Sequence, residues 1–258
     1  MSTHKLTLIF VALFIFLIAW SVGLAAPLTD WLEPPSEMHR YLINKGVLTL
    51  VIATLLWRFR LFAAIGFTSG IGWWSFVIGL PLIALGVLAF FEPGRPALTV
   101  GALAGWTVVV LFVAFTEETL FRGILWRAMS EAGVWKRVIT TSFLFGLSHF
   151  ITALGVFGWS MASVYGLSAF GFGMVFAAMR ERAGTIWSVI IVHIVFDIAA
   201  ISASGGVDAL LEPELETYLR FLGAATVFTA WGSAAIYFMK RRARRAPAES
   251  KNPALADQ

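Results

Sequence analysis

Eight apolar segments, each about as long as the hydrocarbon core of a membrane is thick, dominate this sequence. A spanning helix needs about 20 mostly apolar residues, because each residue adds about 1.5 Å of rise. The eight segments are Leu6–Ala25, Tyr41–Trp57, Trp73–Phe91, Leu98–Leu120, Val138–Leu154, Met161–Met179, Ile186–Ser202 and Tyr218–Met239. Since backbone polar groups inside lipid must bond internally, such segments fold as helices. We therefore predict an all-α fold, a polytopic membrane bundle of about eight transmembrane helices.

The composition excludes a soluble protein. The chain is 59% hydrophobic and 13% charged, whereas a soluble domain is about 45–50% apolar and about 25% charged. It has no cysteine, so disulfides and cysteine-bound metals are excluded. The basic residues flank the apolar segments and do not line one polar face, so we expect no nucleic acid partner.

Lysine and arginine predict the orientation of the spans. If both termini are cytoplasmic, all 19 basic residues except Arg40, Lys45, Arg95 and Arg220 fall on the cytoplasmic side. The first apolar run could belong to a signal peptide, but it is longer than the usual core of about 7–15 residues. We therefore expect a retained first helix in a multi-pass protein of a bacterial plasma membrane, with the lipid bilayer around it.

The spans differ in the chemistry that they carry. Residues 1–104 form generic spans, and residues 105–205 hold the titratable groups discussed below. Residues 206–240 contain the last span, and residues 241–258 form a basic tail that we expect to be disordered and cytoplasmic. No internal repeat is evident, and the sequence does not indicate an oligomeric state.

Two adjacent glutamates, Glu117 and Glu118, lie near the end of the fourth span. Intramembrane acids are costly and are rare unless they are used. Residues four apart share a helix face, while neighbours point about 100° apart, so Arg122 lies over Glu118 and Glu117 points elsewhere. An apolar surrounding favours an uncharged carboxyl, which suits Glu117 as a general base near neutral pH. The alternative is an inert ion-pair network.

Two histidines and an aspartate lie in later spans. His149 is in the fifth span, and His193 and Asp197 are four residues apart in the seventh. Counted from Arg122 as the cytoplasmic end of its span, Glu117 lies about 8 Å deep. Similar counts give about 10 Å for His193 and about 17 Å for Asp197 and His149. We therefore expect the four groups to line one cavity that opens to the cytoplasm.

These motifs, in this order, resemble the CPBP family of intramembrane proteases. That family includes the type II CAAX prenyl endopeptidases and the bacterial Abi-type and bacteriocin-processing or self-immunity proteins. The matching positions are Glu117, Glu118 and Arg122 for EExxxR, Phe145 and His149 for FxxxH, Phe170, Gly173 and Ala177 for a small-residue helix, and His193 and Asp197 for HxxxN/D. The resemblance covers residues 115–200, and we expect Gly173 and Ala177 to serve close helix packing.

The resemblance implies a glutamate-dependent endopeptidase with no acyl-enzyme intermediate. Glu117 and His149 would deprotonate a water, His193 and the HxxxN/D position would stabilise the oxyanion, and Glu118 paired with Arg122 would organise the site. We expect the substrate to be a peptide or membrane protein cut near the cytoplasmic face. A bacterial source favours a leader peptide or a membrane-protein terminus over a prenylated CAAX peptide.

Asp197 departs from the asparagine that many family members have. An ionised aspartate cannot donate a hydrogen bond to an oxyanion, so Asp197 must be protonated or must hold His193 as a donor. With His149 and His193 it also forms a plausible Zn²⁺ ligand set, with Glu117 as the base. The chain has no HExxH motif and its histidines lie on separate helices. We therefore expect no cofactor and keep zinc as the alternative.

Two other classes of function compete with a protease. A proton- or ion-coupled transporter also uses intramembrane acids and histidines, but transporters usually show repeated halves with broken helices, and this chain shows none. A catalytically silent immunity or scaffold protein of the same fold is the second competitor. The intact set of titratable residues argues against it.

Overall fold

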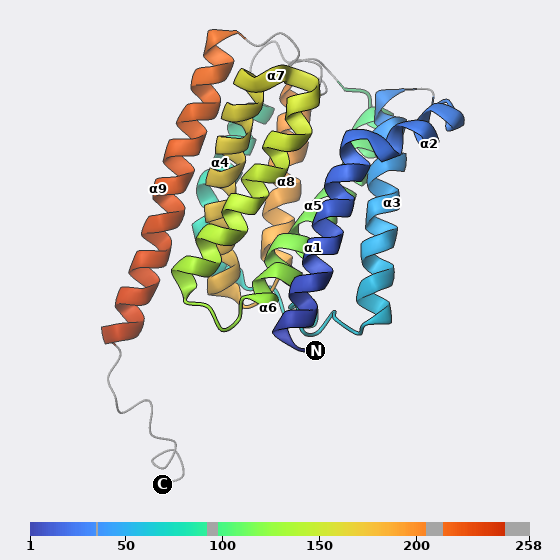
Figure 1. The fold of residues 1–258 in the computed structure, drawn as a ribbon. Coiled ribbons are helices and arrows are strands. Elements are labelled where there is room, and N and C mark those ends of the chain that lie inside the picture. Colours follow the sequence, from blue (N-terminus) through green and yellow to red (C-terminus); the bar gives the residue numbers. More distant parts are fainter. Residues whose placement is uncertain (35, 92–97, 205–213, 246–258) are drawn as a thin grey trace.

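The computed structural model describes residues 1–34, 36–91, 98–204 and 214–245, and within these ranges the chain is helical and contains no strand. The α-helices are α1 Thr3–Ala19, α2 Ala25–Leu32, α3 Glu37–Arg58, α4 Phe76–Phe90, α5 Val100–Glu118, α6 Trp126–Ala128, α7 Val134–Ala183, α8 Trp187–Ser204 and α9 Leu215–Arg245. Two π-helical segments, η1 Trp20–Leu24 and η3 Thr119–Leu125, and the 3₁₀ turn η2 Trp73–Ser75 interrupt or extend them. The long helices stand side by side in a bundle (Figure 1), which confirms the all-α prediction.

Helix α7 is a hairpin of two antiparallel arms. Gly158 has φ 73° and ψ 178°, a conformation that is essentially restricted to glycine, and the chain reverses there (Figure 1). Arg137 near the start of the first arm bonds Glu181 near the end of the second, with Nη2 to Oε2 at 2.7 Å. The two arms correspond to the fifth and sixth predicted spans.

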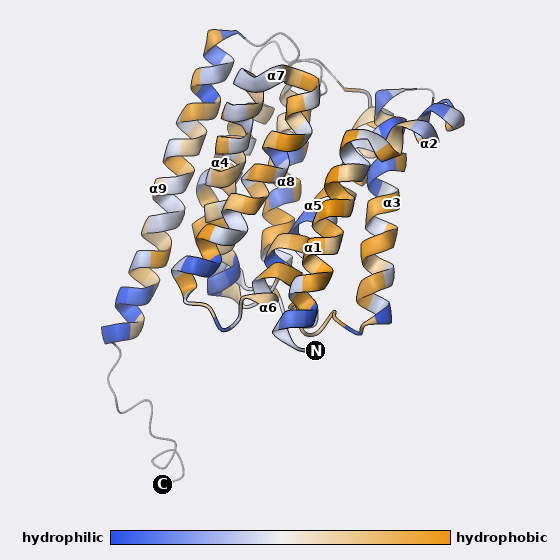
Figure 2. Ribbon diagram, in the orientation of Figure 1, coloured by the Kyte–Doolittle hydropathy of each residue, from blue (hydrophilic) through white to orange (hydrophobic). Residues whose placement is uncertain are grey.

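Six helices of the described chain are long and apolar enough to cross a membrane, with α7 counted as one. Helix α8 is a shorter apolar helix. Hydrophobic residues cover the middle of the helices, and hydrophilic residues gather toward their ends (Figure 2). The protein is therefore a polytopic membrane protein, and the count of eight crossings stays a prediction.

Helix α1 belongs to the core of the bundle. Leu6, Phe10, Leu13 and Leu17 are buried along one face. The ring of Phe10 meets that of Phe121 in η3 edge to face, with 6.1 Å between centroids. Aromatic pairs of this geometry add to the stabilisation from buried apolar area. Helix α1 therefore packs directly against the segment that follows the two glutamates.

The C-terminal helix is longer than predicted. Residues 241–245 continue α9 to Arg245, whereas we expected a disordered tail from residue 241. Arginine and alanine are strong helix formers, so a helix that is already formed extends through them. The rest of the predicted tail, residues 246–258, lies outside the described residues, as do Arg95 and the predicted boundary at residues 205 and 206.

Candidate active site

The helical run that carries the two glutamates continues beyond Arg122. Helix α5 passes into the π-helix η3 and then into α6, which ends at Ala128. We predicted Arg122 at the membrane boundary, but its side chain is 0% exposed, because its partners lie inside the bundle. Glu117 is thus eleven residues from the end of the run, or about 16 Å, and not about 8 Å. Short π-helical segments inside α-helices are frequent at functional sites.

The Arg122 guanidinium is held by one carboxylate, one carbonyl and, as the two nearest of its aromatic neighbours, the rings of Phe145 and Phe176. Its Nη1 lies 3.3 Å from both oxygens of Glu118, and its Nη2 donates to the carbonyl oxygen of Gly173 at 3.2 Å. Its Cζ lies 4.3 Å from the ring centroid of Phe145 and 5.4 Å from that of Phe176. Burying a charge is costly unless it is paired and hydrogen-bonded. This set of contacts fixes the position of Glu118.

Gly173 permits this contact, as the small-residue motif predicts. A Cβ atom at Gly173 would lie 3.1 Å from Arg122 Nη2 and 3.0 Å from the Cα of Ser142. Such approaches are tighter than those of most real side chains. The absence of a side chain therefore brings the second arm of α7 close to both the first arm and η3.

A second arginine, which sequence reasoning placed on the cytoplasmic side, hydrogen-bonds the backbone of η3. Arg180 donates from Nε to the carbonyl oxygen of Arg122 at 2.9 Å and from Nη2 to that of Ile65 at 3.1 Å. Nearby, the Thr185 hydroxyl donates to the carbonyl oxygen of Gly66 at 3.2 Å. These bonds join the segment after α3 to the end of α7 and the start of α8. No pattern in the sequence indicates this role.

His193 lies between carboxylates and against an aromatic ring. Its Nδ1 is 2.8 Å from Glu118 Oε1, and its ring stacks on Phe176 with 5.1 Å between centroids. Its Nε2 is 3.3 Å from Asp197 Oδ2 and 3.9 Å from Glu117 Oε2. A carboxylate held by Arg122 accepts a hydrogen bond from Nδ1–H, so the ring is oriented with Nε2 toward Glu117 and Asp197.

His149 approaches Glu117 from the first arm of α7. Its Nδ1 is 2.9 Å from the carbonyl oxygen of Phe145. A carbonyl oxygen only accepts hydrogen bonds, so Nδ1 carries the proton, and the Nε2 of a neutral His149 is free to accept one. This Nε2 lies 3.8 Å from Glu117 Oε2. Glu117 thus stands between two imidazoles at separations too long for a direct hydrogen bond.

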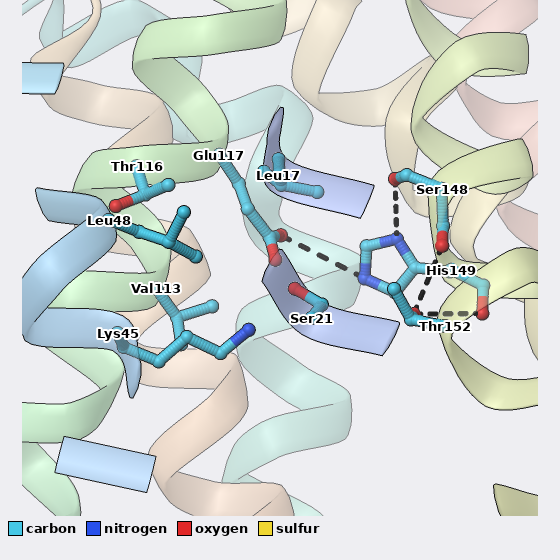
Figure 3. A pocket seen from close by; sticks show the side chains of 10 residues that line it. All are labelled: Leu17, Ser21, Lys45, Leu48, Val113, Thr116, Glu117, Ser148, His149 and Thr152. Atoms are coloured by element: carbon cyan, nitrogen blue, oxygen red, sulfur yellow. Dashed lines mark hydrogen bonds and ion pairs between the residues drawn. The ribbon is translucent and has the colours of Figure 1, made fainter. Parts of the chain in front are cut away.

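A small cavity adjoins Glu117 (Figure 3). Its volume is about 30 Å³, which is room for about two water molecules. Its polar wall includes Ser21, Lys45, Glu117 and His149, of which sequence reasoning missed the first two. The Oε2 atom of Glu117 is buried and has no hydrogen-bond partner in the part of the chain that the structure describes. A buried carboxylate oxygen in this state requires a water or a ligand as its partner.

All six predicted site residues come together in this region. They lie on α5, η3, the first arm of α7 and α8: Glu117, Glu118, Arg122, His149, His193 and Asp197. In the described ranges, no group of three or more histidine, aspartate or glutamate side chains could hold a metal ion. His193 uses Nδ1 for Glu118, and both Nε2 atoms face Glu117. The expectation that no metal is bound here stays a prediction, with zinc as its alternative.

The fold and the site define a helical membrane protein with a buried cluster of acids and histidines. Residues 99–199 match a family model described as Type II CAAX prenyl endopeptidase Rce1-like. The matched part contains all six site residues, and the match supports a place for it in the CPBP/CAAX protease family. Comparisons with curated proteins and with solved structures found no match.

Proposed function

We propose that the protein is an intramembrane endopeptidase that hydrolyses a peptide bond near the cytoplasmic membrane face. One observation carries the proposal: the buried Oε2 of Glu117 has no hydrogen-bond partner among the described residues and stands 3.8 and 3.9 Å from the Nε2 atoms of two histidines. The family match supports the activity class. The substrate is a peptide or a terminus of a membrane protein.

Glu117 and His149 activate the water. Glu117 takes a proton from a water in the adjacent cavity, and the free Nε2 of His149 accepts the second hydrogen bond of that water. The water oxygen attacks the carbonyl carbon of the scissile bond, and a tetrahedral intermediate forms. Glu117 then returns its proton to the leaving amine nitrogen, so the step needs no acyl-enzyme.

His193 stabilises the oxyanion. With both ring nitrogens protonated, it donates Nδ1–H to Glu118 and presents Nε2–H to the negative oxygen of the intermediate. Arg122 holds Glu118 in place, so the ion pair acts by positioning the imidazole. Asp197, at 3.3 Å from Nε2, accepts the hydrogen bond from Nε2–H until the oxyanion forms and takes its place, so it holds the ring ready to donate. This role for Asp197 needs no donation from a carboxylate.

The competing functions gain no support from the described residues. A transporter would need these groups arranged along a path, and they instead cluster around Glu117 and His193. Of the predicted residues, only Glu117 and His149 line the small cavity. A silent scaffold has no need for a buried carboxylate oxygen without a partner. The convergence therefore favours the protease.

The proposal can be tested in membranes that contain the wild type or Glu117→Gln. Peptide termini are compared by N-terminal proteomics, and Glu216→Gln, a change at an exposed glutamate on α9, is the control. We expect new termini in the wild type and in Glu216→Gln that disappear in Glu117→Gln. Identical termini in all three membranes would refute the protease.

A further inference from the structure

One charged side chain at the cavity has no part in this mechanism. Lys45 lies on α3, eight residues after the helix begins at Glu37, which is about 12 Å along the helix axis. Its side chain is turned into the cavity that Glu117 and His149 also line (Figure 3). It lies outside the residues that match the protease family, so the family match assigns it no role.

Lys45 has no partner of opposite charge. No ion pair or hydrogen bond joins its ammonium to another described residue, whereas Arg40, Arg122 and Arg137 each pair with a carboxylate at 2.7 to 3.3 Å. An uncompensated cation inside a membrane bundle is costly and is usually retained for a function. Its three N–H donors are therefore available to a ligand in the cavity.

A second free donor faces the same cavity. The hydroxyl oxygen of Ser21, in the π-helix η1, is buried without a hydrogen-bond partner among the described residues and lines the cavity with Lys45. The residues that precede Ser21 and Lys45 in the sequence bind each other. Trp20 Nε1 donates to both the carbonyl oxygen and Oδ1 of Asn44 at 3.1 Å. This clamp holds Ser21 and Lys45 opposite each other on two helices.

We infer that Lys45 and Ser21 form an anion subsite that binds a carboxylate of the peptide substrate. The inference rests on the proposed function. An unmodified peptide carries negative charge only on carboxylates, and a carboxylate accepts hydrogen bonds from both an ammonium and a hydroxyl. The carboxylate comes either from the C-terminus of the substrate or from an acidic side chain. In both cases the subsite fixes the distance between the substrate's carboxylate and the peptide bond that is cut.

Binding to the full-length protein in detergent tests the inference without requiring cleavage. The probes are three pools of N-acetylated random tetrapeptides: one with a free C-terminal carboxylate, one amidated, and one amidated with a fixed aspartate. The proteins are the wild type, Lys45→Met, Lys45→Arg and Lys136→Met, the last removing an exposed lysine near the start of α7. Bound peptides are quantified by mass spectrometry.

We expect the wild type to bind one of the two carboxylate pools about tenfold more strongly than the neutral pool. The free-acid and aspartate pools distinguish the C-terminus from an acidic side chain. Lys45→Met loses the preference, whereas Lys45→Arg and Lys136→Met keep it. Equal binding of all pools by the wild type, or a preference that persists in Lys45→Met, would overturn the inference.

Cleavage in the same samples separates this inference from the proposed function. If no pool is cut, the protease proposal fails while the binding preference is still measured. If Lys45→Met lowers the cleavage of all three pools equally and binds them as the wild type does, Lys45 acts on Glu117 and the anion subsite is wrong.

Discussion

Arg122 and Gly173 are joined across the bundle by a hydrogen bond of 3.2 Å from Nη2 to the carbonyl oxygen. The bond links the segment after the glutamates to the second arm of α7. Because a Cβ at Gly173 would lie 3.1 Å from that nitrogen, the contact depends on the absence of a side chain. Gly173 is thus part of the support of the site although it bears no chemistry.

Enlarging Gly173 should therefore damage the site. We expect Gly173→Val to lower the free energy of unfolding by about 1–3 kcal/mol, as overpacking typically does, and to lower activity by displacing Arg122. Thermal unfolding and peptide cleavage measure the two effects. Gly155→Val is the control, since a Cβ at Gly155 meets no atom within 4 Å. Equal effects of the two changes would contradict the role of Gly173.

Removing the Arg122 guanidinium should destabilise the protein more than removing an exposed one. Arg122→Ala leaves Glu118 buried at 0% exposure with His193 but without its arginine, and breaking a buried pair from one side costs about 3–5 kcal/mol. Arg220→Ala is the matched control, because Arg220 pairs with Glu216 at the same spacing but both side chains are exposed. Thermal unfolding of the two variants should differ clearly, and similar midpoints would refute the structural role of the buried pair.

The spacing in the sequence explains why part of this site was predictable. Helical geometry separates Glu117 from the Glu118–Arg122 pair, and the structure shows Glu118 at 0% and Glu117 at 15% side-chain exposure. The role of Arg180 and the place of Lys45 were not predictable. The role of Arg180 depends on the contact between η3 and the segment after α3, and the place of Lys45 depends on the contact between η1 and α3. Helical spacing does not encode such contacts.

The depth of the site was also beyond sequence reasoning. An arginine near the end of an apolar run normally marks the membrane boundary, and Arg122 fits that pattern. The structure buries it instead, because Glu118, Gly173 and two aromatic rings supply its partners. The helical run therefore continues to Ala128, eight residues beyond the predicted end of the fourth span at Leu120.

Asp197 offers a test of how His193 is held. If Asp197 acts by accepting from Nε2–H, then Asp197→Asn keeps an accepting oxygen and should stay within about tenfold of the wild-type rate. Asp197→Leu removes the acceptor and should lose about 10²–10³-fold, as for the loss of an oxyanion-hole donor. Peptide cleavage rates measure both. Full activity in Asp197→Leu would remove Asp197 from the mechanism.

Metal removal tests the chemistry of water activation. We expect cleavage by the purified protein to be unchanged after treatment with a strong chelator, because Glu117 takes the proton of a water held by His149 and needs no metal to do so. Added Zn²⁺ should give no increase. Loss of activity on chelation and its return with Zn²⁺ would show that the zinc alternative is right.

The most direct test of the central claim is the rate of peptide hydrolysis by purified Glu117→Gln in lipid nanodiscs, compared with the wild type at equal folded concentration. Glutamine keeps the size of the side chain but cannot take a proton from water. We predict a rate about 10²–10⁴-fold lower than that of the wild type, the usual contribution of a general base, with an unchanged thermal midpoint. Hydrolysis at the wild-type rate would contradict the assignment of Glu117 as the base.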